Sequence, residues 1–447
     1  MEWTRDDTKK LTDRILSFSK AESTFVAVNL TDRANLRFAR NTATTSGAAT
    51  QINVVITASF GKRSTSVTVA QLDDDSLQRA CRRAEEVAKV SPENPESMPD
   101  LGPQTYTSTR PYFDDAAKAS PEWRASAAET AIALSKKKDV VSAGFVETQA
   151  ITQAVASSKG LFAYDRYTAA DFNLTSRTPD GSGSGWASKS FNELKLVDPA
   201  QLASVAIDKA VLAKSPAGIE PGKYTVVLEP AAVADLLAFM LFAGDARQSD
   251  EGRSFYSKKG GGNRIGEQIV GDKVTIYSDP AHPLAPTVAF DGSGLPVTRN
   301  TWVEKGVLKD LFYSRFWAEK MSKKPTGGPN NIIMEGGTAT TNDLIAGVER
   351  GVLVTRFWYI RPLDPQTILY TGLTRDGLYL IEKGKVTRAV KNMRWNESPI
   401  VAFNNLDAMT PAERVVSGEG IGGAGFSIVC PAARIREFTF SSSSDAV

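Results

Sequence analysis

Hydrophobic and polar positions in the first 90 residues follow helical spacing, then strand-like spacing, then helical spacing again. Residues 8–20 and 75–90 carry apolar side chains three and four positions apart, which predicts two helices. Runs rich in valine, isoleucine and threonine lie between them and are typical of antiparallel strands. These runs are Thr24–Leu30, Asn35–Arg40, Gln51–Ser59 and Arg63–Ala70, with Thr31-Asp32 and Phe60-Gly61-Lys62 as expected turns. Residues 1–90 therefore predict a first α+β unit.

The same plan returns after a proline-rich stretch. Residues 91–111 contain five prolines, which lack a backbone donor and favour extended structure, so we expect a linker there. Helices are expected at 120–138 and 199–214, with strand-like runs between residues 140 and 176. Residues 112–215 therefore predict a second helix–strands–helix unit that resembles the first.

From residue 216 onward, strands and glycine turns dominate. Helices are expected at 230–243, where a proline fits the first helical position, and near 342–350. Thr374–Leu378 and Glu382–Lys385 carry the turn signals of β-hairpins. The sequence thus predicts an α+β protein, in which two similar units precede a β-rich C-terminal domain at 216–447. That domain is expected to be a sandwich or a strongly curved sheet.

Charge and composition argue against several classes of function. The 447 residues carry 53 basic and 51 acidic side chains, so a net charge of +2 supplies no basic surface for nucleic acid. Residues 1–7 are polar and lack the apolar core of a signal peptide. The longest apolar run, Leu236–Ala243, is too short to cross a membrane. We expect a cytoplasmic protein that contacts neither membrane nor nucleic acid directly.

The sequence offers few histidine and cysteine side chains for a metal site or for nucleophilic catalysis. The chain has one histidine, His282, in a loop between prolines, and two cysteines, Cys81 and Cys430, each among apolar residues. A zinc site of histidine and cysteine needs three or four ligands, and a catalytic serine or cysteine needs an oriented histidine. A carboxylate site for magnesium or calcium stays open, although no acidic cluster has the spacing of a known calcium loop.

Three glycine-rich segments are expected to be exposed loops. Gly420–Gly425 matches the dinucleotide pattern GxGxxG, but β-forming residues follow it where that fold requires a helix. Lys258–Arg264 and Pro325–Asn331 are polar and rich in turn residues. A nucleotide cradle is the functional alternative for Gly420–Gly425. Because loops on a rigid β scaffold often carry binding functions, a substrate groove is the functional alternative for Lys258–Arg264 and Pro325–Asn331.

Seven short stretches, taken in order, carry a resemblance to one family. They lie early in the chain, on both sides of the expected helix at 230–243, and along the C-terminal domain. Through them the chain resembles the TldD/PmbA family, peptidase U62, whose older label is modulator of DNA gyrase. The stretches are Leu36–Asn41, Tyr224–Pro230, Gly252–Phe255, Gly351–Thr355, Thr374–Gly377, Val390–Asn396 and Pro431–Phe438.

The resemblance implies a relative of zinc peptidases that has lost its metal ligands. Catalytic members of the family carry an HExxxH motif on the helix at 230–243. In this chain its His, Glu and His positions fall on Ala238, Phe239 and Ala243, which can neither bind zinc nor activate water. The family's third ligand is a cysteine in a glycine-rich C-terminal loop, and residues 418–425 contain none. The resemblance therefore implies a TldE/PmbA-type member, with no catalytic residue, metal or cofactor of its own.

The resemblance also implies a partner and a substrate class. TldE/PmbA-type chains pair with a zinc-bearing TldD-type subunit and act in proteolysis and peptide maturation on short or unfolded peptides. We expect a dimer, formed with such a subunit or with a second copy. Arg253, Ser254 and Asn331, in the turn-rich segments after the helix, are the candidates for lining a peptide groove.

Two other hypotheses stay open. The chain could be a peptidase or hydrolase that uses carboxylates or another metal in place of zinc. Its candidate groups are Glu229, Asp235, Asp245, Asp250 and Glu251. It could instead be a stand-alone peptide-binding homodimer, which would need no partner of another kind.

Overall fold

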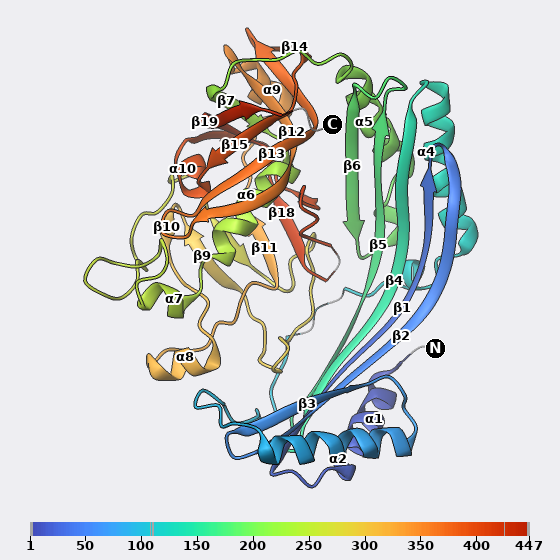
Figure 1. Cartoon of the computed structure of the whole chain (residues 1–447), viewed down its shortest axis with the longest axis vertical. Helices are drawn as coiled ribbons and strands as arrows, with labels where there is room; N and C mark the ends of the chain where they lie inside the picture. Colours follow the sequence, from blue (N-terminus) through green and yellow to red (C-terminus); the bar gives the residue numbers. More distant parts are fainter. Residues whose placement is uncertain (1–2, 108, 110, 424, 445–447) are drawn as a thin grey trace.

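The N-terminal half of the chain forms one long, curved sheet (Figure 1). The computed structural model describes residues 3–107, 109, 111–423 and 425–444. The sheet has the order β3-β2-β1-β4-β5-β6, and all neighbours are antiparallel. Its strands are β1 Ser23–Ala39, β2 Thr42–Phe60, β3 Arg63–Val69, β4 Val141–Ser157, β5 Phe162–Arg177 and β6 Ser184–Phe191.

The two predicted units meet inside this sheet. β1 pairs with β2 on one side and with β4 on the other, so that Asn29 lies opposite both Asn53 and Gln153. The α+β fold class is confirmed, and the strands of the two units form a single sheet. The domain division at residues 91–111 stays a prediction.

Helices cover one face of the sheet. α1 (Arg5–Phe18) and α2 (Asp74–Val90) pack at one end, and α4 (Pro121–Lys137) and α5 (Pro199–Leu212) at the other, as the apolar spacing predicted. The short α3 (Asp114–Ala117) precedes α4. The opposite face looks toward the C-terminal domain (Figure 1). Each of the four longer helices begins after a side chain that accepts a backbone N–H of the first turn: Thr4, Asp73, Ser120 and Asp198.

β1 is longer than its sequence pattern predicted. The turn expected at Thr31-Asp32 was wrong, because both residues lie inside the strand and Thr31 pairs with Gln51 and Ile151. Two flanking strands supply backbone partners along most of β1, and this pairing outweighs the weak turn preference of a single aspartate. The two runs predicted on either side of the turn therefore form one strand.

Gly144 of β4 makes room for an aromatic pair beneath the helices. Replacing it with alanine is expected to lower the free energy of unfolding by about 1–3 kcal/mol, because the added Cβ overpacks the site. That atom would lie 2.4 Å from Cζ of Phe38, whose ring stacks on Phe172. Gly47→Ala in β2 is the matched control, since no described atom lies within 4 Å of its Cβ position. Urea unfolding of both variants tests the expectation, and equal losses would contradict it.

The C-terminal domain surrounds helix α6 (Pro230–Phe242) with two sheets. In the first, β12, β7, β19, β15 and β13 are joined in that order, and β12 also pairs with β13, so these five strands close into a barrel-like ring. This confirms the strongly curved form of the predicted β-rich domain. The strands, with the attached β14 and β16, are β7 Gly222–Leu228, β12 Arg350–Asp364, β13 Leu369–Glu382, β14 Lys385–Ala389, β15 Met393–Glu397, β16 Leu406–Met409 and β19 Ala433–Ser443.

The second sheet and four short helices complete this domain. The sheet has the order β10-β9-β8-β11-β18-β17. Its strands are β8 Ile276–Ser278, β9 Asn300–Glu304, β10 Val307–Leu308, β11 Asn331–Met334, β17 Glu413–Val415 and β18 Ser427–Cys430, and the helices are α7 Ala246–Asp250, α8 Arg315–Lys320, α9 Thr341–Ala346 and α10 Pro399–Asn404. Within the described residues, no helix is long and apolar enough to cross a membrane.

The two predicted hairpin turns have different outcomes. Glu382–Lys385 does join β13 to β14, with Lys383 and Gly384 in the left-handed region. The hairpin expected at Thr374–Leu378 was wrong, because these residues lie within β13. There Asp376 and Gly377, at φ +54° and +127°, form a bulge where the register with β12 shifts. The Asp-Gly signal thus marks a bulge that turns a buried aspartate toward the other domain.

Candidate functional site

Helix α6 is the core helix of the C-terminal domain. Strand β7, which pairs in parallel with β12, leads into its first turn, and Pro230 occupies its first position, as predicted. Nearly every side chain from Ala231 to Leu241 is buried, on all faces of the helix. A helix that is apolar all round is stable only inside a core, so α6 is held by packing against the two sheets.

The three positions on which the resemblance places HExxxH lie toward the C-terminal end of α6. Ala238 is fully buried. Phe239 is half-buried and packs on Tyr370, with ring centroids 4.9 Å apart. Ala243 caps the helix, and its carbonyl oxygen accepts a hydrogen bond from the Ser254 hydroxyl at 3.3 Å. Apolar contacts therefore fill the place where this pattern would require ligands.

A glycine-rich loop at residues 416–425, of which Ala424 lies outside the described residues, packs against α6. We call it the glycine loop. Asp235 of α6 accepts the backbone N–H groups of Gly418 and Glu419, each at 3.1 Å. Burial raises the pKa of the Asp235 carboxyl to about 7, against the lowering effect of these bonds. A Cβ at Gly418 would lie 2.7 Å from an Asp235 oxygen and 2.4 Å from the Phe357 carbonyl oxygen, so the close approach requires glycine.

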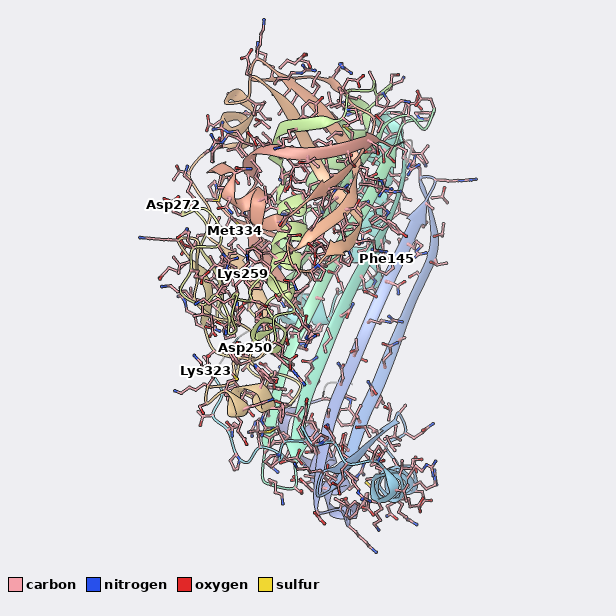
Figure 2. All side chains as sticks on the ribbon, turned by 60° about the vertical axis from the view of Figure 1, so that its left-hand side comes forward. Phe145, Asp250, Lys259, Asp272, Lys323 and Met334 are labelled. Atoms are coloured by element: carbon pink, nitrogen blue, oxygen red, sulfur yellow. The ribbon has the colours of Figure 1, made fainter. Side chains whose placement is uncertain are left out.

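A groove of about 490 Å³, here called the interdomain groove, lies between the glycine loop and the uncovered face of β4–β6. Figure 2 marks Phe145 where this face approaches the C-terminal domain. Glu147 of β4 and Asp171 of β5 are register partners and face the groove together. The main lining side chains are Phe145, Glu147, Gln149, Tyr167, Asp171, Asn173, Trp186, Ser188, Arg356, Trp358, Ser417 and Glu419.

Carboxylates outnumber cations along the interdomain groove. Glu147, Asp171 and Glu419 line it, and Arg356 is the cation among its lining side chains. The Arg356 guanidinium is already held by Asp376 and lies over the Trp186 ring, 4.7 Å from its centroid. Burial raises the pKa of Asp171 to about 6, so its side chain is mostly charged at neutral pH. The groove therefore has polar walls with aromatic ends, which suits an extended peptide better than an apolar ligand.

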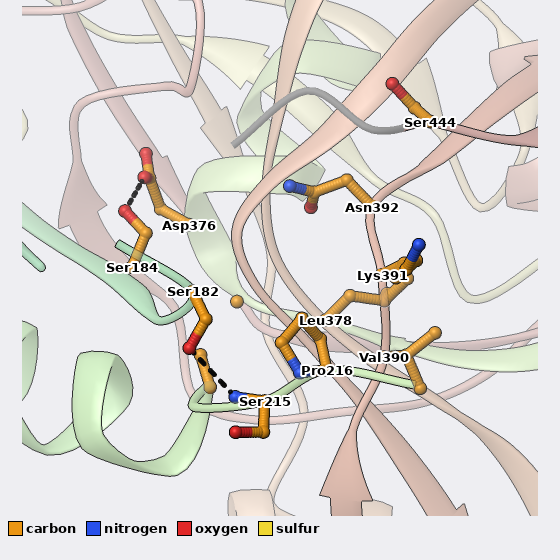
Figure 3. A pocket seen from close by; sticks show the side chains of 12 residues that line it. Ser182, Ser184, Ser215, Pro216, Asp376, Leu378, Val390, Lys391, Asn392 and Ser444 are labelled. Atoms are coloured by element: carbon orange, nitrogen blue, oxygen red, sulfur yellow. Dashed lines mark hydrogen bonds between the residues drawn. The ribbon is translucent and has the colours of Figure 1, made fainter. Parts of the chain in front are cut away.

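A second cavity, of about 380 Å³, opens where the β5–β6 loop meets the β13 bulge (Figure 3). Asp376 lies at its wall and accepts a hydrogen bond from the Ser184 hydroxyl of β6. The same carboxylate accepts a hydrogen bond from Nε of Arg356 at 2.8 Å. All three side chains are buried, so this cluster couples the long sheet to the C-terminal domain through polar contacts.

The three residues predicted to line a peptide groove are not brought together. Asn331 is fully buried, and its amide donates to the carbonyl oxygens of Asp279 and Ala285 at 2.6 Å each. Ser254 is buried against the end of α6, and Arg253 is exposed and paired with Glu251. None of the three lines the interdomain groove as the structure describes it. Its walls come from alternate polar residues of β4 and β5, a pattern that by itself indicates only a solvated strand face.

The carboxylates near α6 each have structural partners. Asp235 holds the glycine loop, and Glu229 pairs with Lys209. Asp245 caps α7, and Asp250 accepts Nε1 of Trp317 at 2.7 Å. Because these groups point to different neighbours, the described structure does not assemble them into one catalytic cluster.

Comparison with known families identifies the chain. Residues 111–214 match the model of the PmbA/TldA metallopeptidase central domain, and residues 221–442 match that of the PmbA/TldA metallopeptidase C-terminal domain. Together these matches cover most of the sequence. The chain belongs to the PmbA/TldD family.

Individual relatives are distant. A metalloprotease of Methanothermobacter thermautotrophicus is 23% identical over 53% of this chain and 55% of the relative. A metalloprotease TldD homolog of Haemophilus influenzae is 26% identical over 39% of this chain and 40% of the relative. The matched segments therefore span about half, or less, of the length of these PmbA/TldD relatives.

Solved structures of PmbA/TldD proteins share the whole fold. TldE from Thermococcus kodakarensis superposes with a TM-score of 0.86 at 18% identity, covering 97% of this chain and 99% of that chain. A candidate modulator of a DNA gyrase from Thermotoga maritima gives 0.84 at 17% identity, covering 97% and 100%. At these identities the likeness establishes the fold.

Zinc, the metal of the family's peptidases, does not fit the donor set of this PmbA/TldD chain. Ala238, Phe239 and Ala243 offer no side-chain nitrogen, oxygen or sulfur. Cys430 contacts the Pro230 carbonyl oxygen, at the other end of α6 and about 12 Å along the helix from Ala238. Among the described residues, no group of three or more histidine, cysteine, aspartate or glutamate side chains could hold a metal ion.

Proposed function

We propose that this chain is a non-catalytic subunit of a PmbA/TldD-type peptidase, which works beside a zinc-bearing TldD-type chain. The observation that carries the proposal is the presence of Ala238, Phe239 and Ala243 at the three HExxxH positions, in a helix whose residues from Ala231 to Ala238 are all buried. Apolar residues at these positions remove the cost of burying polar groups. They favour a structural use of α6 over an altered active site.

We further propose that the interdomain groove holds a segment of an extended peptide. Its polar walls and its position between the long sheet and the glycine loop support this use. This assignment replaces Arg253, Ser254 and Asn331 as groove residues. A peptidase with altered chemistry is less well supported, because the carboxylates near α6 are each tied to separate structural partners.

Coexpression with a TldD-type chain tests the proposal. We expect the two chains to copurify, with zinc bound in proportion to the partner. The complex is expected to cleave unfolded casein at least about tenfold faster than the partner alone, because a tenfold gain corresponds to one good binding interaction. This chain purified alone is expected to hold no stoichiometric zinc and to leave casein intact. Failure to form a complex, together with unchanged partner activity, would contradict the proposal.

A charge-reversing substitution tests peptide binding in the interdomain groove independently of complex formation. Glu147→Lys is expected to raise KM for casein without loss of copurification, because Glu147 lines the groove and is only half-buried. Glu129→Lys is the matched control, since Glu129 is exposed on α4, on the helix-covered side of the sheet. Equal KM values for the two variants would remove the groove from the proposal and leave the subunit assignment standing.

A further inference from the structure

Three polar side chains form a row across the floor of the interdomain groove. Glu147 of β4 lies opposite Asp171 of β5, and Asp171 lies opposite Ser190 of β6. Directly opposite residues of antiparallel strands lie on the same face, with Cβ atoms about 5 Å apart. Because Glu147 and Asp171 line the groove, Ser190 is also on the face that looks toward it. The three neighbouring strands can be followed in Figure 1.

Neither carboxylate of this row has a cation as its partner. Within the described part of the chain, no salt bridge joins Glu147 or Asp171 to a lysine or arginine. Glu147 accepts a hydrogen bond from the neutral Gln149 at 2.6 Å. Burial raises the pKa of Asp171 and the charge of Arg414 opposes this, but the Arg414 guanidinium donates to Asn192 Oδ1 at 2.7 Å instead. Like charges directly opposite each other destabilise a sheet, so an added cation would stabilise this row.

The Ser190 hydroxyl is an independent indication of a missing ligand. Ser190 is 3% exposed, and its Oγ atom has no hydrogen-bond partner within the described structure. It approaches Asp171 closely enough to oppose the effect of burial on the pKa of that carboxyl, yet without a hydrogen bond of normal geometry. A Cβ at Gly423, in the wall of the groove, would lie 3.8 Å from this oxygen. Buried hydroxyls nearly always have a partner, so the row has an acceptor to spare.

A primary ammonium group fits this row better than a metal ion. The ammonium of lysine has three donors and no acceptor, which matches two carboxylates and a hydroxyl. Among the described residues, no group of three or more histidine, cysteine, aspartate or glutamate side chains could hold a metal ion. Phe145, two residues before Glu147 on the same strand face, also lines the groove. Its ring lies about 7 Å along β4 from the row and offers an apolar surface to the methylene groups of a lysine.

We propose that the interdomain groove selects peptides that contain lysine, and that the lysine ammonium binds to Glu147, Asp171 and Ser190. The inference rests on the proposed function, because it names the class of peptide that the groove takes. The ammonium neutralises the two opposed carboxylates and gives the Ser190 hydroxyl a partner. Recognition is therefore by side-chain charge, at one position of the bound peptide.

The test measures binding to the full chain by fluorescence anisotropy at pH 7.5. The ligand is the acetylated and amidated peptide Thr-Gln-Ser-Lys-Ser-Gln-Thr-Cys, labelled with tetramethylrhodamine on its cysteine. Companion peptides carry norleucine or glutamate in place of lysine. We expect the lysine peptide to bind at least about tenfold more tightly than the norleucine peptide, because its ammonium makes charge-assisted hydrogen bonds. The glutamate peptide is expected to bind most weakly, because the row repels it.

Free n-butylamine distinguishes a peptide lysine from an amine that is not part of a peptide. It carries the same ammonium and a similar apolar stem, but it lacks the contacts of the peptide backbone. We expect it to displace the labelled lysine peptide only at concentrations at least about a hundredfold above the dissociation constant of that peptide.

Two isosteric variants locate the ammonium. Asp171→Asn and Glu147→Gln each remove one negative charge with little change in size, and each is expected to lower the preference for lysine over norleucine at least about threefold. Asp171→Asn should keep or raise the unfolding temperature, because it relieves a like-charge contact. Glu129→Gln, exposed on α4 on the helix-covered side of the sheet, is the matched control and should keep the full preference.

Four results would overturn the proposal. Equal affinity for the lysine and norleucine peptides would remove the selectivity but leave the groove as a peptide site. A preference that survives in both Asp171→Asn and Glu147→Gln would place the ammonium elsewhere. Butylamine that competes as well as the peptide would assign the row to free amines. Binding of none of the peptides would remove the peptide groove together with its selectivity, whereas the subunit assignment is tested separately by copurification with a TldD-type chain.

Discussion

Replacing Asp376 with alanine is expected to lower the free energy of unfolding by about 3–5 kcal/mol, because it leaves a buried guanidinium without its carboxylate. Asp376 is 2% exposed and Arg356 8%, and the two are joined through Nε of Arg356 at 2.8 Å. The substitution also removes the acceptor of the Ser184 hydroxyl, across the contact between the long sheet and the C-terminal domain. Equilibrium unfolding in urea measures the loss.

Two companion variants identify the cause of that loss. Asp13→Ala removes an exposed carboxylate that pairs with Lys9 on the surface of α1, and is expected to cost less than about 1 kcal/mol. Arg356→Met/Asp376→Leu removes both buried charges and should recover much of the stability, because no unpaired charge remains. If Asp376→Ala and Asp13→Ala lose similar amounts, the buried pair does not couple the two domains.

Local signals in the sequence were sufficient for the longer helices, whereas the short α3, α7, α8 and α10 were not predicted. Pro121, Pro199 and Pro230 each occupy a first helical turn, and the capping side chains before α4 and α5 are the types that the pattern requires. Apolar spacing then identifies the buried face, as Leu77 and Cys81 of α2 show. Such features act within one or two turns of chain, so no distant contact is needed to predict them.

Pairing between strands that are distant in sequence explains the features that local sequence patterns did not predict. The Thr31-Asp32 turn disappears because strands on both sides hold β1 extended, and the Asp376-Gly377 turn becomes a bulge because β12 and β15 fix the strand around it. A short turn signal has a small intrinsic preference, which tertiary pairing readily outweighs. The single sheet shared by the two predicted units likewise depends on β1–β4 pairing, which no local pattern encodes.

The candidate site, like the fold, was only partly predictable from the sequence. That Ala238, Phe239 and Ala243 carry no metal-binding atom follows from their residue types alone, and their place as the HExxxH positions stays a prediction from the resemblance. The interdomain groove could not be predicted, because Glu147 and Asp171 lie far apart in the chain and become neighbours only through the β4–β5 register. The prediction that Asn331 lines a peptide groove rested on a misleading local pattern. Its turn-rich surroundings indicated an exposed loop, but its amide satisfies buried carbonyl oxygens.

The pH dependence of stability is expected to report the contact between α6 and the glycine loop. Burial raises the pKa of Asp235 from 3.8 to about 7 in the folded protein. Between these values the folded chain binds a proton that the unfolded chain releases, so this group makes stability fall as pH rises. The fall is about 1.4 kcal/mol for each pH unit between about 5 and 7, and it ends above pH 7, where both states are ionised.

The contribution of Asp235 is isolated by comparison with Asp235→Asn, unfolded in urea at a series of pH values. Other groups titrate equally in both proteins, so the difference in unfolding free energy, wild type minus variant, should decrease from pH 5 to 7 and then level off. Asp13→Asn, on the surface of α1, is the control and should give a difference that changes little over this range. A flat difference for Asp235→Asn would mean that the carboxylate is charged in the folded protein throughout. The bonds from Gly418 and Glu419 would then outweigh the cost of burial, and the glycine loop would be anchored by a full negative charge on α6.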